Sequence, residues 1–185
     1  MISPGRILLT VAWLVWLYPF VFRAPHNQKR PSTTRKGATT VGLLLETAGI
    51  VLAFLVERPG ETAESWWRVG VAIVLWAVSC VLAWSAVKHL GKQFRVNAGL
   101  YQDHELVRTG PYAVVRHPIY AALLGMLLAT IVLLTPWQWA LVSLALFIAG
   151  TEIRVRTEDG LLASRFPEAF AEYRRKVPAY VPFVR

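Results

Sequence analysis

Five long apolar runs, separated by polar segments, constrain this chain more than any other feature. Each run is close to the roughly 20 residues that a helix needs to cross about 30 Å of hydrocarbon. The chain is 55% hydrophobic and holds eight Trp in 185 residues, which is more apolar surface than a soluble domain normally buries. We therefore predict an all-α integral membrane protein with about five transmembrane helices. The runs cover residues 6–22, 39–56, 66–87, 119–134 and 137–153.

The last two runs are shorter than full spans and are separated only by Thr135 and Pro136. This spacing predicts a C-terminal helical hairpin with a tight link. Small residues recur every four positions on both runs, and such stripes let two helix backbones approach closely in lipid. We therefore expect the two helices to pack on each other. The small residues are Ala121, Gly125 and Ala129 on the first run and Ala145 and Ala149 on the second.

The second run contains an acidic residue, Glu46, on the same helical face as Gly42 and Gly49. A face with two glycines normally packs on protein, so Glu46 is expected to point inward. A carboxylate inside a membrane is a functional candidate. A hydrogen-bonded structural glutamate fits the pattern equally well, and we assign Glu46 no catalytic role.

The positions of the basic residues indicate how the spans are oriented. The chain has 20 Lys and Arg against 11 Asp and Glu, but the cations are distributed over loops instead of gathering on one soluble face, which argues against a nucleic-acid partner. Seventeen of the 20 lie in segments 23–36, 88–116 and 154–185. By the positive-inside rule these segments are cytoplasmic, so we expect an outer N-terminus and a cytoplasmic C-terminus. Tryptophans at 66–67, 137 and 139 then mark the outer interface.

Residues that commonly bind metals do not form a ligand pattern in this sequence. The single cysteine, Cys80, lies inside the third run, and the four histidines show no His-x-x-x-His spacing. We therefore expect no metal site and no disulfide.

Two polar clusters flank the hairpin, and both fall on the cytoplasmic side in this topology. In the first, 103–112 is expected to be a loop with a turn at Gly110 and Pro111, and a helix is expected to begin at His117-Pro118. A helix N-terminus favours an anionic group, and tyrosine ring faces can hold a cationic one. The second cluster contains Arg154 and Glu158, four residues apart on one helix face.

Each of these residues also has a purely structural interpretation. Arg154 and Glu158 have the spacing of a helix-surface salt bridge, which is worth about 0.2–0.5 kcal/mol. His117 before a proline fits a helix cap, and Arg116 fits an anchor at the lipid surface. The occurrence of both clusters at the same end of one hairpin favours a ligand-binding site.

The clusters resemble the isoprenylcysteine carboxyl methyltransferase and phospholipid methyltransferase superfamily. His-x-Leu-Val-x-x-Gly-x-Tyr stands at 104–112, Arg-His-Pro-x-Tyr at 116–120, and Val-Pro-Ala-Tyr-Val-Pro at 177–182. The resemblance covers about residues 94–184, with Asp159 in place of the second acid of a Glu-Glu pair. Ala122 and Phe170 stand where the family often has Gly and Tyr.

The resemblance implies a cofactor, S-adenosylmethionine, and a set of residues for the site. It implies Arg154 and Glu158 as the catalytic residues, with Arg154 binding the substrate. The implied cofactor-binding residues are Asn97, His104, Leu106, Val107, Tyr112, His117, Tyr120 and Glu158.

We therefore predict methyl transfer to a lipophilic acceptor with a polar head, entering from the bilayer. A carboxylate head, as in a prenylcysteine, is favoured because it is already a nucleophile and Arg154 can hold it through a bidentate fork. An amine or phenol would need a base, for which Glu158 and His117 are candidates. Two other classes stay open: an NADPH-dependent sterol-type reductase, although the chain has no GxGxxG, and a non-catalytic membrane protein that binds a ligand.

We expect residues 1–185 to form one membrane domain. Residues 1–90 supply three N-terminal spans, and 91–185 supply the cofactor-binding loop, the hairpin and a cytoplasmic tail. Aromatic and charged residues interleave in the tail between 160 and 176, which predicts an amphipathic helix over the site and against the lipid headgroups.

Overall fold

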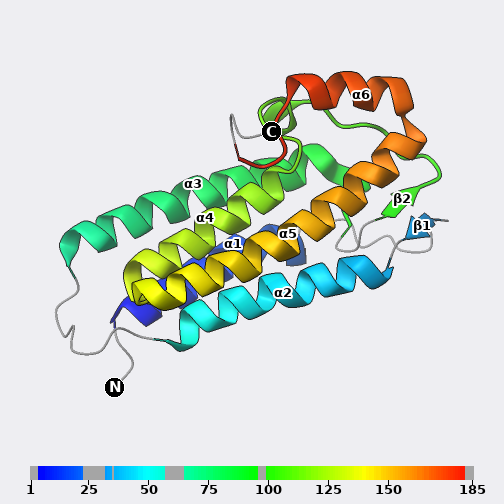
Figure 1. Cartoon of the computed structure of the whole chain (residues 1–185). Helices are drawn as coiled ribbons and strands as arrows, with labels where there is room; N and C mark the ends of the chain where they lie inside the picture. The colour runs from blue at the N-terminus through cyan, green and yellow to red at the C-terminus, as the bar shows by residue number, and fades with distance from the viewer. Residues whose placement is uncertain (1–3, 23–31, 35, 57–64, 96–98, 182–185) are drawn as a thin grey trace.

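The protein is a bundle of apolar helices with a short helix and a small strand pair at one end (Figure 1). The structure, a computed structural model, describes residues 4–22, 32–34, 36–56, 65–95 and 99–181. The long helices are α1 (Pro4–Phe22), α2 (Lys36–Leu55), α3 (Trp66–Leu90), α4 (Pro118–Leu134) and α5 (Trp137–Arg165). The shorter elements are β1 (Ser32–Thr34), η1 (Gly91–Gln93), β2 (Gly99–Tyr101), η2 (Gly110–Ala113) and α6 (Pro167–Lys176). The all-α membrane fold is thus confirmed, with β1 and β2 pairing antiparallel.

Four of the five apolar helices are long and hydrophobic enough to cross a membrane, and α4 is the shorter fifth. With 17 residues, α4 is about 25 Å long, just under the hydrocarbon thickness. The prediction that the last run is also short was wrong, because α5 has 29 residues and continues through the second polar cluster to Arg165. The polar part of α5 remains helical since one of its faces is buried on protein, including Arg154, Val155 and Asp159.

The prediction that the small residues of α4 and α5 pack against each other was also wrong. Thr135 and Pro136 do link α4 to α5, but Ala145 and Ala149 are exposed. Gly125 of α4 faces α3 instead, where an added Cβ would lie 2.2 Å from Ser79 Oγ. Small residues permit close approach without specifying which helix approaches.

Helix α5 packs on α2, and glycines make the approach possible. A Cβ on Gly150 would lie 2.5 Å from the carbonyl oxygen of Gly42, and one on Gly49 would lie 2.6 Å from the carbonyl oxygen of Ser143. Glu46 lies between the two α2 glycines and is only 1% exposed, so the prediction that this face packs on protein is confirmed.

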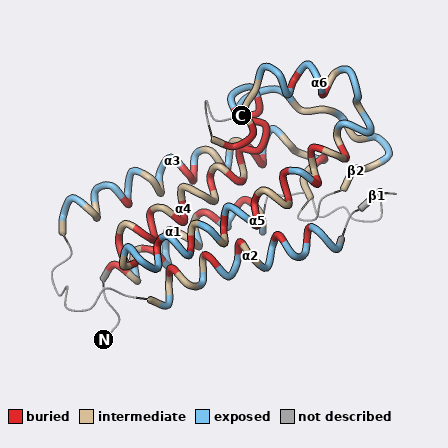
Figure 2. Tube along the Cα trace, viewed as in Figure 1, coloured by how far each residue is buried: buried red, intermediate tan, exposed pale blue. Residues whose placement is uncertain are grey.

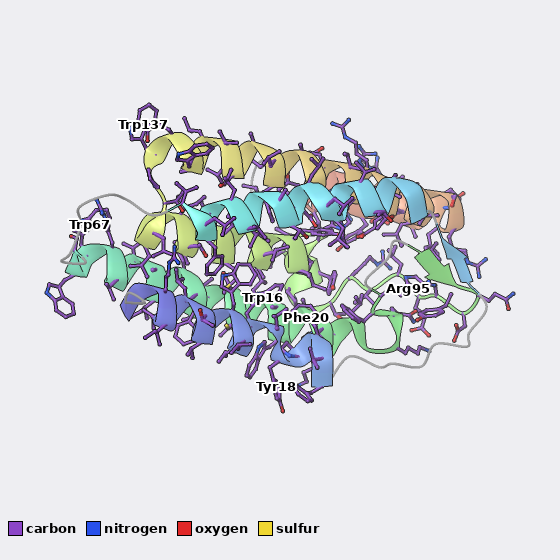
Figure 3. All side chains as sticks on the ribbon, turned by 90° about the horizontal axis from the view of Figure 1, so that it is seen from below. Trp16, Tyr18, Phe20, Trp67, Arg95 and Trp137 are labelled. Carbon is purple, nitrogen blue, oxygen red and sulfur yellow. The ribbon has the colours of Figure 1, made fainter. Side chains whose placement is uncertain are left out.

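The outer surface of the bundle is apolar, as a lipid-facing surface requires. Figure 2 shows exposed residues along the outer sides of the helices and buried ones on their inner sides. Trp67 and Trp137 are exposed at one end of the bundle, and Arg95 lies at the other (Figure 3).

The polar end of the bundle is built from the segment before α4 and from the tail. Gly110 has a φ of +60° and packs directly against the ring of His89, so a side chain there would be both strained and blocked. Helix α4 begins at Pro118, as predicted. Helix α6 buries Phe170 and Tyr173, and the Tyr173 hydroxyl donates a hydrogen bond to the carbonyl of Tyr112. The tail therefore rests on the first polar cluster.

Candidate functional site

A cavity of about 410 Å³ opens at the polar end of the bundle, between the helices and the segment before α4. Its volume lies in the range of small-molecule sites, about 300–1,000 Å³. The cavity collects residues from both clusters, which are far apart in the sequence. The predicted site residues that line it are His104, Tyr112, His117, Tyr120, Arg154 and Glu158.

His117 occupies the N-cap of α4 and makes two contacts with α5. Its Nε2 lies 2.8 Å from Asp159 Oδ1, and its Nδ1 lies 3.3 Å from Glu158 Oε2. Burial alone would lower the pKa of His117, but the hydrogen bonds to Asp159 and Glu158 outweigh it and raise this pKa from 6.5 to about 9. The ring is therefore protonated at neutral pH and donates both N–H groups. His117 is thus the N-cap residue of α4, as the structural interpretation expected, but its side chain makes no capping bond to the helix and binds α5 instead.

Arg116 is 4% exposed, so the interpretation of this residue as an anchor at the lipid surface was also wrong. Its Nη2 lies 3.0 Å from Asp159 Oδ2, and its Nη1 donates to the carbonyl of Val177. The backbone N–H groups of Arg116 and His117 donate to the carbonyls of Pro178 and Ala179, at 2.8 Å each. Asp159 thus joins two neighbouring cations, and the tail fixes the backbone that carries them.

Arg154 connects α5 to α4 and α2 in a buried network. Its Nε donates to the Tyr120 hydroxyl at 2.8 Å, and its Nη1 donates to Glu46 Oε2 at 3.2 Å. The Tyr120 hydroxyl in turn donates to Glu158, and Thr151 donates to Glu46 Oε1 at 2.9 Å. Because Arg154 is 7% exposed and bonds across helices, the interpretation of a surface salt bridge was wrong.

Of the other predicted cofactor residues, Tyr112 lines the cavity and Leu106 and Val107 do not. Burial raises the pKa of Tyr112 well above its usual range, which keeps the phenol neutral. Leu106 and Val107 are half-buried and fall outside the set of described residues that line the cavity. Asn97 lies outside the residues that the structure describes.

Gln93, which was not among the predicted site residues, ends η1 and lines the same cavity. Gln93 is 4% exposed, and both polar atoms of its amide lack a hydrogen-bond partner among the described residues. Leaving such atoms unpaired costs about 1–3 kcal/mol, so Gln93 suits a ligand that supplies the partner. The sequence did carry a sign of this role, because Gln93 is a polar residue that lies between the third apolar run and the first polar cluster.

The cavity has a charged end and an apolar end. Aromatic rings of α1 form much of the apolar end, and the Trp16 and Phe20 centroids lie 4.6 Å apart. The apolar lining includes Trp13, Trp16, Leu17, Phe20, Leu43, Ile50 and Leu123. This division suits a ligand with a polar head and an apolar body. In the part of the chain that the structure describes, no three His, Cys, Asp or Glu side chains are grouped to hold a metal ion.

The family model and two of the similar proteins carry the same description. The model of the isoprenylcysteine carboxyl methyltransferase (ICMT) family matches residues 71–164, which is 94 of the 185 residues. The chain is 36% identical over 103 residues to the protein-S-isoprenylcysteine O-methyltransferase of Schizosaccharomyces pombe, covering 54% of this chain and 43% of that protein. It is 27% identical over 135 residues to protein-S-isoprenylcysteine O-methyltransferase B of Arabidopsis thaliana, covering 72% and 68%.

A relative of another description is also similar. The cobalt-zinc-cadmium resistance protein CzcN of Cupriavidus metallidurans is 42% identical over 82 residues, 44% of this chain and 37% of that protein. The chain thus spans less than half the length of this relative and of the S. pombe enzyme.

Proposed function

Because the chain belongs to the isoprenylcysteine carboxyl methyltransferase family, we propose that it is a membrane enzyme that methylates the polar head of a lipophilic acceptor. The observation that carries this proposal is that charged side chains and aromatic, apolar side chains line one and the same cavity. The family match gives no support to the reductase alternative.

The residues at the charged end fit S-adenosylmethionine, which carries a carboxylate, two cationic groups and an adenosine. When bound, this cofactor supplies a methyl group on a positively charged sulfur. Glu158 and the rings of Tyr112 and Tyr120 suit the cations, and protonated His117, whose two N–H groups point to Asp159 and Glu158, holds the Glu158 carboxylate in place. Gln93 suits the hydrogen-bonding edge of a base or a ribose. His104, Leu106, Val107 and Asn97 are assigned to the same cofactor by the family motif.

We assign Arg154 to the acceptor, with a carboxylate as the favoured head. Arg154 would hold an acceptor carboxylate oxygen toward the methyl group that the cofactor would supply, and methylation of that oxygen would give an ester without any proton transfer. The chain's contribution is orientation, which can supply about 7–11 kcal/mol of barrier lowering. His117 is already protonated at neutral pH, so only Glu158 of the two candidate bases can serve an amine or phenol.

The apolar end of the cavity suits the body of a lipid, such as a prenyl chain, that arrives from the bilayer between α1 and α2. Arg95, which lines the cavity, lies at the end of the bundle opposite Trp67 and Trp137 (Figure 3). With most basic residues on the loops of that end, we propose that the site and C-terminus are cytoplasmic and that the N-terminus is outside.

Calorimetric binding of S-adenosylhomocysteine to the detergent-solubilised protein tests the cofactor site. We expect binding by wild type, and loss of at least tenfold in affinity for His117→Ala and Glu158→Ala, since each removes a charged cavity contact. Glu105→Ala is the matched control, because its carboxylate is 71% exposed and pairs with Lys92 outside the cavity. Absence of binding by folded wild type refutes the proposal, and binding without turnover on any lipid acid supports the non-catalytic alternative.

A further inference from the structure

Glu46 is a buried carboxylate that the proposed reaction leaves without a role. It lies in the middle of the 20-residue helix α2, is 1% exposed and lines the cavity. Two groups hold it there, the Thr151 hydroxyl at 2.9 Å and Arg154 Nη1 at 3.2 Å.

The position of Glu46 matters because it shares a cation with the acceptor. Arg154 also lines the cavity, with its Nε on Tyr120 and its Nη1 on Glu46. A carboxylate acceptor that reaches this guanidinium therefore meets a carboxylate already bound to it. Two anions near one buried cation repel each other strongly, since the surroundings screen them poorly.

We propose that Glu46 is a specificity-determining residue that competes with the acceptor carboxylate for Arg154. This inference rests on the proposed function, in which Arg154 binds the acceptor. In the free protein Glu46 neutralises the buried cation, and the acceptor head takes over that role when it binds. The side chain touches none of the reacting atoms, so it acts through Arg154.

The same contact gives Glu46 a part in product release. Methylation converts the acceptor carboxylate, with one negative charge, into a neutral ester. An ester cannot compensate the charge of buried Arg154, and an uncompensated buried charge is strongly destabilising. Glu46 then forms its ion pair with Arg154 again, and this displaces the ester head of the product from the guanidinium.

The test compares an acid with its ester on the full detergent-solubilised chain. The probes are N-acetyl-S-farnesylcysteine and its methyl ester, with binding measured by calorimetry in the absence of cofactor. For Glu46→Gln we expect the acid to bind about tenfold more tightly than it binds wild type, and the ester to bind equally to both proteins. A structural defect would weaken both probes together.

Two further variants keep the result interpretable. Thr151→Val disturbs the same cluster but keeps its charge, so the acid is expected to bind within about threefold of wild type. Glu46→Asp also keeps the charge but draws it back from Arg154, and it replaces Glu46→Gln if that variant does not fold, with a gain of about threefold expected for the acid.

The proposal is overturned if Glu46→Gln binds the acid no more tightly than wild type does. It is also overturned if neither protein binds the acid. Because the acid and ester are measured without cofactor, these results are separate from S-adenosylhomocysteine binding. If wild type does not bind S-adenosylhomocysteine, the proposed function is refuted. The comparison of acid and ester binding then still decides whether Glu46 competes for Arg154.

Discussion

Replacement of Asp159 by Asn should remove most of the pH dependence of stability that His117 confers. Asp159 accepts a hydrogen bond from His117 at 2.8 Å and forms an ion pair with Arg116 at 3.0 Å. All three side chains are buried. The pKa of His117 is about 9 in the folded protein against an ordinary 6.5. That difference corresponds to about 3 kcal/mol of stabilisation of the protonated ring, at roughly 1.4 kcal/mol per pH unit.

The direction of the effect follows from the raised pKa. Below pH 6.5 the ring is protonated in both states, and its stabilising contacts count in full. As the pH rises from 6.5 to about 9, the unfolded ring is neutral while the folded ring must keep its proton, so stability falls. Wild type should therefore lose about 3 kcal/mol over this window, or roughly 6–12 °C in Tm.

Asp159→Asn removes the strongest partner of His117, so burial dominates and the pKa of His117 falls toward its ordinary value. The variant should be less stable than wild type at pH 6.5 by several kcal/mol, because Arg116 also loses its buried anion. The difference in unfolding free energy between wild type and the variant should then become smaller by about 2–3 kcal/mol at pH 9.5.

Thermal unfolding of solubilised wild type and variant at pH 6.5, 8.0 and 9.5 measures this difference. Glu172→Gln is the control, since it removes an exposed carboxylate on α6 that pairs with Lys176 one helical turn later, away from His117. If Asp159→Asn and wild type show parallel curves of Tm against pH, then Asp159 does not hold the proton on His117 and the reasoning fails.

Three other substitutions probe the bundle and the cavity. Gln93→Met should raise the Tm of the free protein, because it removes unpaired amide atoms that cost about 1–3 kcal/mol, and should weaken S-adenosylhomocysteine binding by calorimetry; unchanged binding would exclude Gln93 from the ligand site. Gly150→Ala should destabilise the protein by about 1–3 kcal/mol in a thermal melt, since the new methyl meets the Gly42 carbonyl, and an unchanged Tm would contradict the close α2–α5 contact. Arg154→Lys should raise KM for a lipid acid at least tenfold in a methyl-transfer assay, because a lysine cannot form the bidentate fork, and a normal KM would remove Arg154 from acceptor binding.

The helices could be predicted from the sequence because hydrophobic length and proline position are local properties. Each of the five runs became a helix, and α4 starts at the proline expected. The inward face of Glu46 was predictable for the same reason, since Gly42 and Gly49 share its spacing. The pairing of the helices could not be predicted, because several helix faces carry small residues. Whether α4 packs on α3 or on α5 depends on how the side chains of both faces fit together in three dimensions.

The charged site shows the same limit. The spacing of Arg154 and Glu158 predicted that both would face one side of α5, and both line the cavity. Their partners come from α2 and α4, over 30 positions earlier in the chain, so spacing within one helix gave no sign of them. Asp159 looked like a mild departure from a family pattern, yet it binds two cations at once.

The hydrogen bonds from the Arg116 and His117 backbone to Pro178 and Ala179 also determine when the site can form during synthesis. Chains emerge from the ribosome N-terminus first, and earlier segments fold first. The bundle helices α1 to α5 can therefore insert and pack while the segment before α4 still lacks its backbone partners. The site is completed only after some sixty further residues have been made and the tail has docked. A nascent chain arrested before residue 177 should be inserted in the membrane but unable to bind ligand.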